Sequence, residues 1–518
     1  MQHKFKLLSL CAGSLFLFFL NSSISLTSSN TKPLQYNLDE ELRKGNFLIG
    51  IKQYVGKTNK KKNDEKGITF STEKKLLKLR SSNGVILKSK KIKIIFQELL
   101  LNEPYFSERY VSGPYSSYES AKKESIRLKK IGIEPLIAFP KDWELWLPLT
   151  TSLPKNSNFK LIKQSISHQI VPFLQTEFSS HKLEGPIFVS SDEIIKIDNK
   201  KYGKDFYLVN DSYGTWTLVQ QLSFGKYLEG VLPHEIGINS PIEALKSQAI
   251  IARTWALYNS DRFKIDNYHL CVTTECQVYK PSPINSQRVK KAINSTANQI
   301  LIYRDKPINA FYHASNGGIS ASASESWDMQ DYPYLQSRPD SIIKWDKVLT
   351  LPFIDENYLQ EFLDNPSKNI FGQKHYLFRW KKKISVEDIK NILLKNKLIT
   401  KDMNSFEILI KERGLSGRVT ELSINYKNMN KKVILKKDQI RKVLKFLPSN
   451  LFIIDKLNDN FWLFHGAGFG HGVGLSQSGA IEMANAGFNF KTILNNYYPG
   501  TKLKTIEYIF KKSNFIID

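Results

Sequence analysis

This chain of 518 residues has neither an excess of glycine and proline nor, after its N-terminal segment, a long apolar run. Glycine and proline number only 27 and 20, and hydrophobic residues make up 41% against 24% charged, which excludes a collagen-like or disordered chain. Beyond the N-terminal segment, no run is long and apolar enough to span a membrane. The length instead predicts about three to four folded units with cores of their own.

Acidic side chains are in deficit as well. The sequence has 49 Asp and Glu against 75 Lys and Arg, which gives a formal net charge of +26. Such an excess favours a polyanionic partner, namely nucleic acid, anionic lipid or a cell-wall polymer. A lysine-rich solvated surface without a specific partner is the alternative interpretation.

The N-terminal residues bear on the choice between these partners. A basic stretch at 1–6 precedes the apolar run Leu7–Leu20 and a small polar stretch that ends at Ser25. The run is about 14 residues long, whereas a spanning helix needs ~20. Residues 1–25 are therefore predicted to be a cleaved signal peptide, with a retained membrane anchor as the alternative. Export takes the protein away from nucleic acid and towards the cell envelope, on the periplasmic or cell-wall side.

Periodicity and turn residues predict a mixed α+β chain of several units, β-rich in its N-terminal region. Ser240 as N-cap, with Glu243 in a capping box, predicts a helix in the core of strands and helices, and Ser476 opens another that Gly487 ends. The expected units are a linker at 26–45, a small β unit at 46–100, a βαβ insertion at 104–150, and the core at 184–518 with a more polar subregion at about 380–450.

Five glycines alternate between Gly466 and Gly474. No dinucleotide-binding fingerprint fits this run, and the run contains no Gly-Lys-Ser/Thr for a phosphate loop. Because glycine lets the backbone approach other groups closely, the run is predicted either to contact a ligand or to form a tight strand-to-helix connection.

Two other patterns are incomplete by themselves. His234-Glu235 lacks the second histidine of a zinc protease, since Ile238 stands in its place. A lone glutamate in this position is usually a solvated or capping residue. The close pair Cys271 and Cys276 is, in an exported protein, a disulfide, a metal clip or a coincidence.

Taken in order, several segments resemble the SpoIID/LytB family, which is named for stage II sporulation protein D and the amidase enhancer. The resemblance extends from about residue 184 to the C-terminal end. The segments that carry it are Leu222–Glu235, Pro241–Thr254, Ala310–Gly318, Glu325–Trp327, Tyr332–Leu335, Ser416–Val419, Ile440–Arg441, Gly468–Ala480 and Tyr497–Gly500.

The resemblance implies chemistry on peptidoglycan. Family members include lytic transglycosylases that cut glycan strands stripped of stem peptides, and Glu235 stands at the matching acidic position. One carboxyl group suffices: when protonated it gives a proton to the glycosidic oxygen, and when ionised it takes the proton of the sugar's own 6-hydroxyl. The product carries a 1,6-anhydro ring, and the chemistry requires no cofactor. Burial should raise the pKa of Glu235 for this role.

The resemblance also implies supporting residues. Six polar residues are expected to line the glycan cleft: Tyr312, His313, Ser315, His471, Ser476 and Gln477. The two histidines are equally well interpreted as structural groups that orient a loop. Zinc-binding members use two cysteines and histidines, which His269, Cys271 and Cys276 match here, while Glu275 stands where a second histidine is expected. A structural zinc and a Cys271–Cys276 disulfide both stay open.

Residues 104–150 more weakly resemble part of a SPOR domain, a module that binds denuded glycan, and a plain βαβ insertion is the alternative. The sequence as a whole predicts an exported lytic transglycosylase that acts on peptidoglycan glycan strands and not on nucleic acid. A non-catalytic, glycan-binding enhancer of a cell-wall amidase is the second hypothesis. A third, an anionic-lipid or DNA binder driven by charge, predicts steeply salt-dependent binding.

Overall fold

The computed structural model describes residues 24–25, 36–56, 67–281, 286–342, 352, 355–400, 406–426 and 432–512. The chain is mixed α+β, which confirms the predicted fold class. The expected signal segment lies outside the described residues except for its last two positions, Ile24 and Ser25. None of the helices described is long and apolar enough to cross a membrane.

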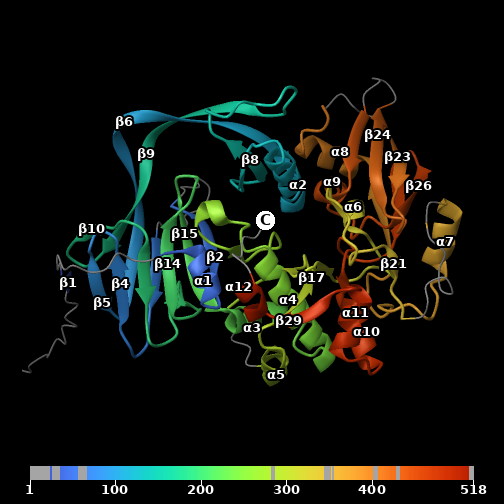
Figure 1. Ribbon diagram of the computed structural model, residues 1–518. Coiled ribbons are helices and arrows are strands. Elements are labelled where there is room, and N and C mark those ends of the chain that lie inside the picture. The colour runs from blue at the N-terminus through green and yellow to red at the C-terminus, as the bar shows by residue number, and fades with distance from the viewer. Residues whose placement is uncertain are drawn as a thin grey trace, which may run out of the picture.

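Two large sheets form the N-terminal half (Figure 1). One has the strand order β1-β5-β4-β11-β14-β15-β2-β16, and the other has the path β10-β9-β6-β3-β12-β13. Apolar side chains of both sheets share one core, including Phe70, Leu79 and Ile94. The strands are β1 (Ile24–Ser25), β2 (Asn46–Val55), β3 (Gly67–Ser71), β4 (Leu77–Ser81), β5 (Ile86–Ser89), β6 (Lys91–Tyr115), β9 (Lys160–Gln175), β10 (Ser180–Lys182), β11 (Ile187–Ser190), β12 (Lys196–Ile197), β13 (Lys200–Lys201), β14 (Asp205–Asn210), β15 (Trp216–Ser223) and β16 (Leu270–Cys271).

Strand pairing joins two segments that were predicted to belong to separate units. Strand β4 pairs with β11, and β2 pairs with β15, so residues of the expected small β unit at 46–100 lie in one sheet with the start of the expected core at 184–518. Local patterns show where strands form but not which distant strand completes the sheet, and no boundary at residue 184 is seen in the pairing. Helix α1 (Leu38–Arg43), capped by Asn37, lies within the expected linker at 26–45.

Strands β6 and β9 continue together as a long two-stranded ribbon that carries the insertion. Figure 1 shows this ribbon arching over the molecule and placing helix α2 (Tyr118–Lys129) beside the C-terminal half. The strand–helix–strand pattern expected at 104–150 is present, but β8 (Trp143–Leu147) pairs antiparallel with both β6 and β7 (Leu136–Ala138). The insertion is therefore not a simple βαβ crossover, because β8 lies between the two strands that flank the helix.

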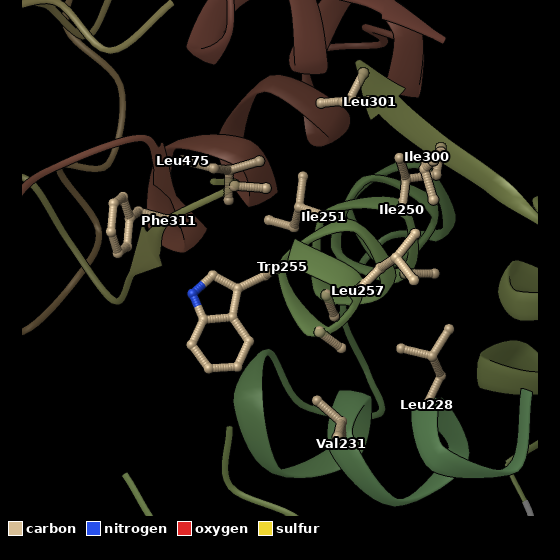
Figure 2. Packing of buried hydrophobic residues seen from close by; sticks show 14 of the residues in the cluster. Leu228, Val231, Ile250, Ile251, Trp255, Leu257, Ile300, Leu301, Phe311 and Leu475 are labelled. Atoms are coloured by element: carbon tan, nitrogen blue, oxygen red, sulfur yellow. The ribbon is translucent and has the colours of Figure 1, made fainter. Parts of the chain in front are cut away.

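The helical core surrounds α4, which is apolar on nearly every side. Figure 2 shows Ile250, Ile251, Trp255 and Leu257 of α4 packed among side chains of α3, β17 and the segments near Phe311 and Leu475. Its elements are α3 (Phe224–Glu235), α4 (Ile242–Tyr258), η1 (Lys264–Asp266), α5 (Gln287–Ser295), β17 (Gln299–Tyr303), β18 (Lys306–Pro307), β19 (Tyr312–His313), β28 (Leu475–Ser476), α10 (Gln477–Asn485), α11 (Phe490–Tyr497), β29 (Lys502–Thr505) and α12 (Ile506–Lys512).

Capping at the two predicted helix starts differs. Ser476 caps α10, and Gly487 follows its end at φ +91°, as predicted. The capping box predicted at Ser240 is wrong, because the Ser240 hydroxyl donates to the backbone carbonyl of Ile236 instead. The Glu243 carboxylate accepts from Lys246 and from the backbone N–H of Phe490, a partner that sequence proximity does not reveal.

The third region packs two three-stranded sheets and helices α8 and α9 around a separate core. It contains the polar subregion expected at about 380–450. Its elements are β22 (Trp380–Ser385), α8 (Val386–Lys395), β23 (Phe406–Arg413), β24 (Val419–Tyr426), β25 (Lys432–Lys436), α9 (Asp438–Val443), β26 (Phe452–Asn458) and β27 (Phe461–Gly466), and the connection from the core holds β20 (Ile319–Ser320), α6 (Ala323–Ser326), β21 (Arg338–Pro339) and α7 (Glu356–Asp364).

Candidate functional site

Glu235 is the last residue of α3 and lines a cleft of about 660 Å³. We call this space the Glu235 cleft; its lining includes Glu235, Trp255, Tyr312, Trp327, His471 and Arg441. Tyr227, Leu228 and Val231 of α3 are fully buried in the helical core, and this packing fixes the direction of the helix. The end of α3, and with it Glu235, is thereby held at the cleft.

Three groups contact the Glu235 carboxylate. Its Oε1 accepts a hydrogen bond of 2.7 Å from the backbone N–H of Val278, and the side chains of Tyr312 and Gln477 also hydrogen-bond to it. Burial has the largest effect and raises the pKa of Glu235 above its ordinary value, while these three hydrogen bonds lower it and offset part of the increase. The carboxyl group is thus partly buried, oriented and biased towards its protonated form.

The chain brings these partners together from distant segments. Strand β19 pairs in parallel with β28, with Tyr312 opposite Leu475 and His313 opposite Ser476. This register places Tyr312 beside the start of α10, where Gln477 begins the helix. The Gln477 amide nitrogen also lies 3.4 Å from Gln248 Oε1 on α4.

The glycine-rich run contributes Phe469, Gly470 and His471 to the lining of the same cleft. Its glycines serve a purpose that the sequence analysis did not identify. Gly470 and Gly472 have φ of +116° and +84°, and a Cβ would lie 2.8 Å from His313 Cβ and 2.4 Å from the Arg418 guanidinium, respectively. These two glycines therefore let the loop pack closely on the protein itself.

His313 and His471 line the cleft as a pair, with ring centroids 5.2 Å apart. The Nδ1 of His471 accepts from the backbone N–H of Val473 at 3.1 Å, and its ring donates to the backbone carbonyl of Tyr312. The Nδ1 of His313 lies 3.1 Å from the Val473 carbonyl oxygen. Burial lowers the pKa of both residues, that of His471 to about 3, so both rings are neutral near pH 7.

Ser315 and Ser476 are only 1% and 0% exposed. Ser315 exchanges two backbone hydrogen bonds with Phe469, and the Ser476 hydroxyl accepts from the backbone N–H of Gly479 as the N-cap of α10. Their observed contacts hold the loop and the helix in place. Of the six residues expected at the cleft, Tyr312, His313 and His471 line it and Gln477 contacts Glu235, whereas these two serines lie behind it.

Cys271 and Cys276 form a disulfide. The remaining expected zinc ligand, His269, hydrogen-bonds to the backbone instead. The Nδ1 of His269 accepts from the Leu48 N–H at 2.8 Å, and its Nε2 lies 3.1 Å from the Leu38 carbonyl oxygen. Within the described part of the chain, no three His, Cys, Asp or Glu side chains are grouped to hold a metal ion. The residues do not fit a zinc site, because both sulfurs are joined and both ring nitrogens have backbone partners.

The disulfide loop supports the site in another way. It ends just before Val278, whose N–H binds Glu235, and the Glu275 carboxylate accepts from the Trp143 indole N–H at 2.8 Å. The loop therefore connects the insertion to the Glu235 carboxylate.

Sequence reasoning missed the cationic side of the cleft. Arg262 follows α4 and pairs with Glu119 of α2 at 2.6 Å, and the side chains are only 3% and 9% exposed. Arg441, Lys442 and Lys445, in and just after α9, also line the cleft. These residues come from three regions, so no local pattern indicates that they meet.

Comparisons with known proteins assign two parts of the chain. Residues 212–303 match the family described as "Stage II sporulation protein", and residues 321–474 match a "Domain of unknown function (DUF8618)". The first match contains Glu235 and the disulfide, and the second contains His471 and Arg441.

Curated relatives match over more than half of the chain. An uncharacterized protein of Brachyspira hyodysenteriae is 28% identical over 62% of this chain and 76% of its own length. The "Amidase enhancer" of Bacillus subtilis is 28% identical over 53% of this chain, but only 40% of that relative is covered. The "Stage II sporulation protein D" of Bacillus amyloliquefaciens is 25% identical over 57% of this chain and 78% of its own length.

Proposed function

Since this chain belongs to the SpoIID/LytB family, we propose that it is an exported lytic transglycosylase that cleaves denuded peptidoglycan strands in the cell envelope. The observation that carries the proposal is the partly buried Glu235 carboxyl, which has a raised pKa and faces a cleft. A protonated carboxylic acid is the group that glycosidic bond cleavage requires.

The reaction that we propose uses one carboxyl group twice. Protonated Glu235 donates its proton to the glycosidic oxygen as that bond breaks, and the resulting carboxylate takes the proton of the 6-hydroxyl as this oxygen bonds to the anomeric carbon. The Val278 N–H and the Tyr312 and Gln477 side chains stabilise the carboxylate between these steps. The proton is returned to Glu235, and the products are a strand with a free 4-hydroxyl and a strand with a 1,6-anhydro end.

The space around Glu235 suits a polymer. A second cavity of about 1230 Å³ adjoins the Glu235 cleft, and both are lined by Ser116 and Asp438. The larger cavity lies between the tip of the β6–β9 ribbon and the third region. Together the two spaces extend beyond what a single sugar needs.

Enhancement of a cell-wall amidase is the second candidate function, favoured by the "Amidase enhancer" among the relatives. In that case the cleft binds glycan without cutting it. The product distinguishes the two functions, because only the transglycosylase creates anhydro ends without an added amidase.

The test is Glu235→Gln, which keeps the side-chain volume but removes the acid. We expect cleavage of purified denuded glycan to fall by about 10²-fold or more, measured by mass spectrometry of anhydro products. Glu229→Gln is the matched control, because Glu229 lies on the same helix and its carboxylate pairs with Lys226 at the surface. Unchanged anhydro product from Glu235→Gln would remove Glu235 from the mechanism, and activity that appears only with an amidase would favour the enhancer.

A further inference from the structure

Arg441 is a cation in the Glu235 cleft for which the described part of the chain supplies no ion pair. It projects from α9 into the cleft lining, its Nε is enclosed without a hydrogen-bond partner, and within the described residues the guanidinium has no ion pair. Burial alone lowers the pKa of Arg441, with no anionic neighbour to raise it. An enclosed charge without a partner is costly, so a bound anion would stabilise it.

The neighbouring arginines have partners of their own, although the Nε atoms of Arg262 and Arg418 are also enclosed without one. Arg418 donates to the backbone carbonyls of Ile319 and Asn316 at 3.0 and 2.9 Å. Arg262 pairs with Glu119. Lys442, although next to Arg441 in sequence, bonds to Asp142 at 2.9 Å. Arg441 therefore differs from them in having its charge available to a ligand.

Arg441 acts electrostatically on the two histidines of the cleft. Its charge contributes to lowering the pKa of His313 and His471, and Arg418 acts in the same direction. Both histidines are neutral and line the cleft, so they add no negative charge. Three carboxylates of the cleft are engaged by other groups, Glu119 by Arg262, Glu275 by Trp143 and Asp438 by Ser120. An anionic ligand group therefore suits the unpaired Arg441.

We propose that Arg441 binds the lactyl carboxylate of a muramic acid residue in the glycan strand. This inference rests on the proposed function, since the anion must enter the cleft together with a sugar chain bound at Glu235. A guanidinium presents two parallel N–H groups that match a carboxylate. In a strand stripped of stem peptides this carboxylate is free, whereas in a strand that carries peptides it is a neutral amide. Arg441 would thereby select unsubstituted muramic acid at one position of the cleft.

The experiment measures binding in the Glu235→Gln background, where cleavage does not consume the ligand. The probes are a tetrasaccharide of alternating N-acetylglucosamine and N-acetylmuramic acid with free lactyl carboxylates, and the same tetrasaccharide with those groups converted to methyl amides. Calorimetry should show at least about tenfold tighter binding of the free acid. Adding Arg441→Gln should abolish this difference, and Arg441→Lys should retain part of it.

The control is Lys456→Gln, which removes one positive charge outside both cavities, where Lys456 pairs with Asp459. It should leave the preference for the free acid unchanged. Thermal unfolding checks the fold, and Arg441→Gln should be no less stable than its parent, because it removes an enclosed unpaired charge.

Three results would overturn the inference, and they show whether the proposed function fails with it. Equal binding of acid and amide by the Glu235→Gln protein, or a preference that survives Arg441→Gln, refutes the carboxylate site and leaves the proposed function standing. Absence of binding to either tetrasaccharide refutes the proposed function together with the site.

Discussion

At the residue scale, the Glu235 carboxyl is governed by opposing effects of burial and hydrogen bonding, and burial is the larger. A raised pKa in the folded state means that the unfolded chain releases this proton first as pH increases. Above the ordinary pKa of 4.5, the folded state holds more of this proton than the unfolded state. This group therefore lowers the free energy of unfolding as pH rises through the interval between the two pKa values.

We therefore expect Glu235→Gln to gain thermal stability relative to wild type as pH increases from about 4 to 7. Glutamine does not titrate, so the variant lacks the loss that wild type suffers over this interval. The measurement is the difference in Tm between the two proteins at several pH values, in which effects of all other groups cancel. Any constant offset from altered hydrogen bonds at Val278 does not change with pH. A Tm difference that is the same at pH 4 and pH 7 would contradict a raised pKa.

The sequence revealed Glu235 and not Arg441 for a physical reason. Glu235 lies in a short segment whose amino-acid sequence resembles that of a known family, and such a resemblance can be recognised without knowing the fold. The significance of Arg441 lies in its enclosed Nε, which has no hydrogen-bond partner among the residues that the structure describes. The burial of Ser315 and Ser476 behind the cleft was likewise beyond the sequence, because it depends on the pairing of β19 with β28 and of Ser315 with Phe469.

At the scale of elements, helix α3 packs closely at Gly230 against the segment that follows the disulfide, at Tyr279 and Lys280. A Cβ at this position would lie 2.3 Å from the Tyr279 ring and 2.8 Å from the Lys280 carbonyl oxygen. The Lys280 N–H also donates to the Gly230 carbonyl. The same segment supplies the Val278 N–H that binds Glu235, so the close approach at Gly230 sets the position of a contact in the site.

We expect Gly230→Ala to lower the free energy of unfolding by about 1–3 kcal/mol, because the segment must shift to admit the methyl group. Cleavage should fall as well, since Val278 moves relative to Glu235. Gly225→Ala is the matched control on the same helix, where the nearest atom to a new Cβ is Ile293 Cγ2 at 3.9 Å. That variant should be stabilised by up to about 1 kcal/mol, as alanine favours a helix over glycine. Denaturant titration measures the free energy of unfolding of both variants. Equal values for Gly230→Ala and Gly225→Ala would refute the close contact at Gly230.

Elements were predictable where their signals are local. The start of α10 at Ser476 and its end before Gly487 follow from an N-cap and a glycine with positive φ. The Ser240 capping box failed because Glu243 bonds to Phe490, a residue 247 positions away in the sequence. The β unit at 46–100 is not separate for the same reason, since β4 is completed by β11 and β2 by β15.

At the scale of the whole molecule, the insertion at the ribbon tip contacts the two halves of the protein very differently. Towards the core, Trp143 is 1% exposed and packs with Tyr118, Phe139 and Phe263. Towards the third region, the contacts are polar, such as the ion pair of Asp142 with Lys442 and the hydrogen bond from Ser120 to Asp438. The insertion is therefore an integral part of the N-terminal half and a weakly attached neighbour of α9.

Substitutions at the adjacent residues Asp142 and Trp143 test whether the insertion is held more firmly by the core than by α9. Trp143→Ala should lower the free energy of unfolding by about 3–5 kcal/mol, because it empties a closed aromatic cluster and leaves Glu275 without the indole N–H. Asp142→Ala removes an ion pair whose side chains are 36% and 40% exposed, and should cost less than about 1 kcal/mol. Chemical denaturation of the two variants measures both values.

Because Trp143 also holds the disulfide loop beside Glu235, its loss should reduce glycan cleavage under conditions where the variant remains folded, whereas Asp142→Ala should retain most of the activity. A cost for Asp142→Ala as large as that for Trp143→Ala would mean that the insertion is fixed to α9 as firmly as to the core.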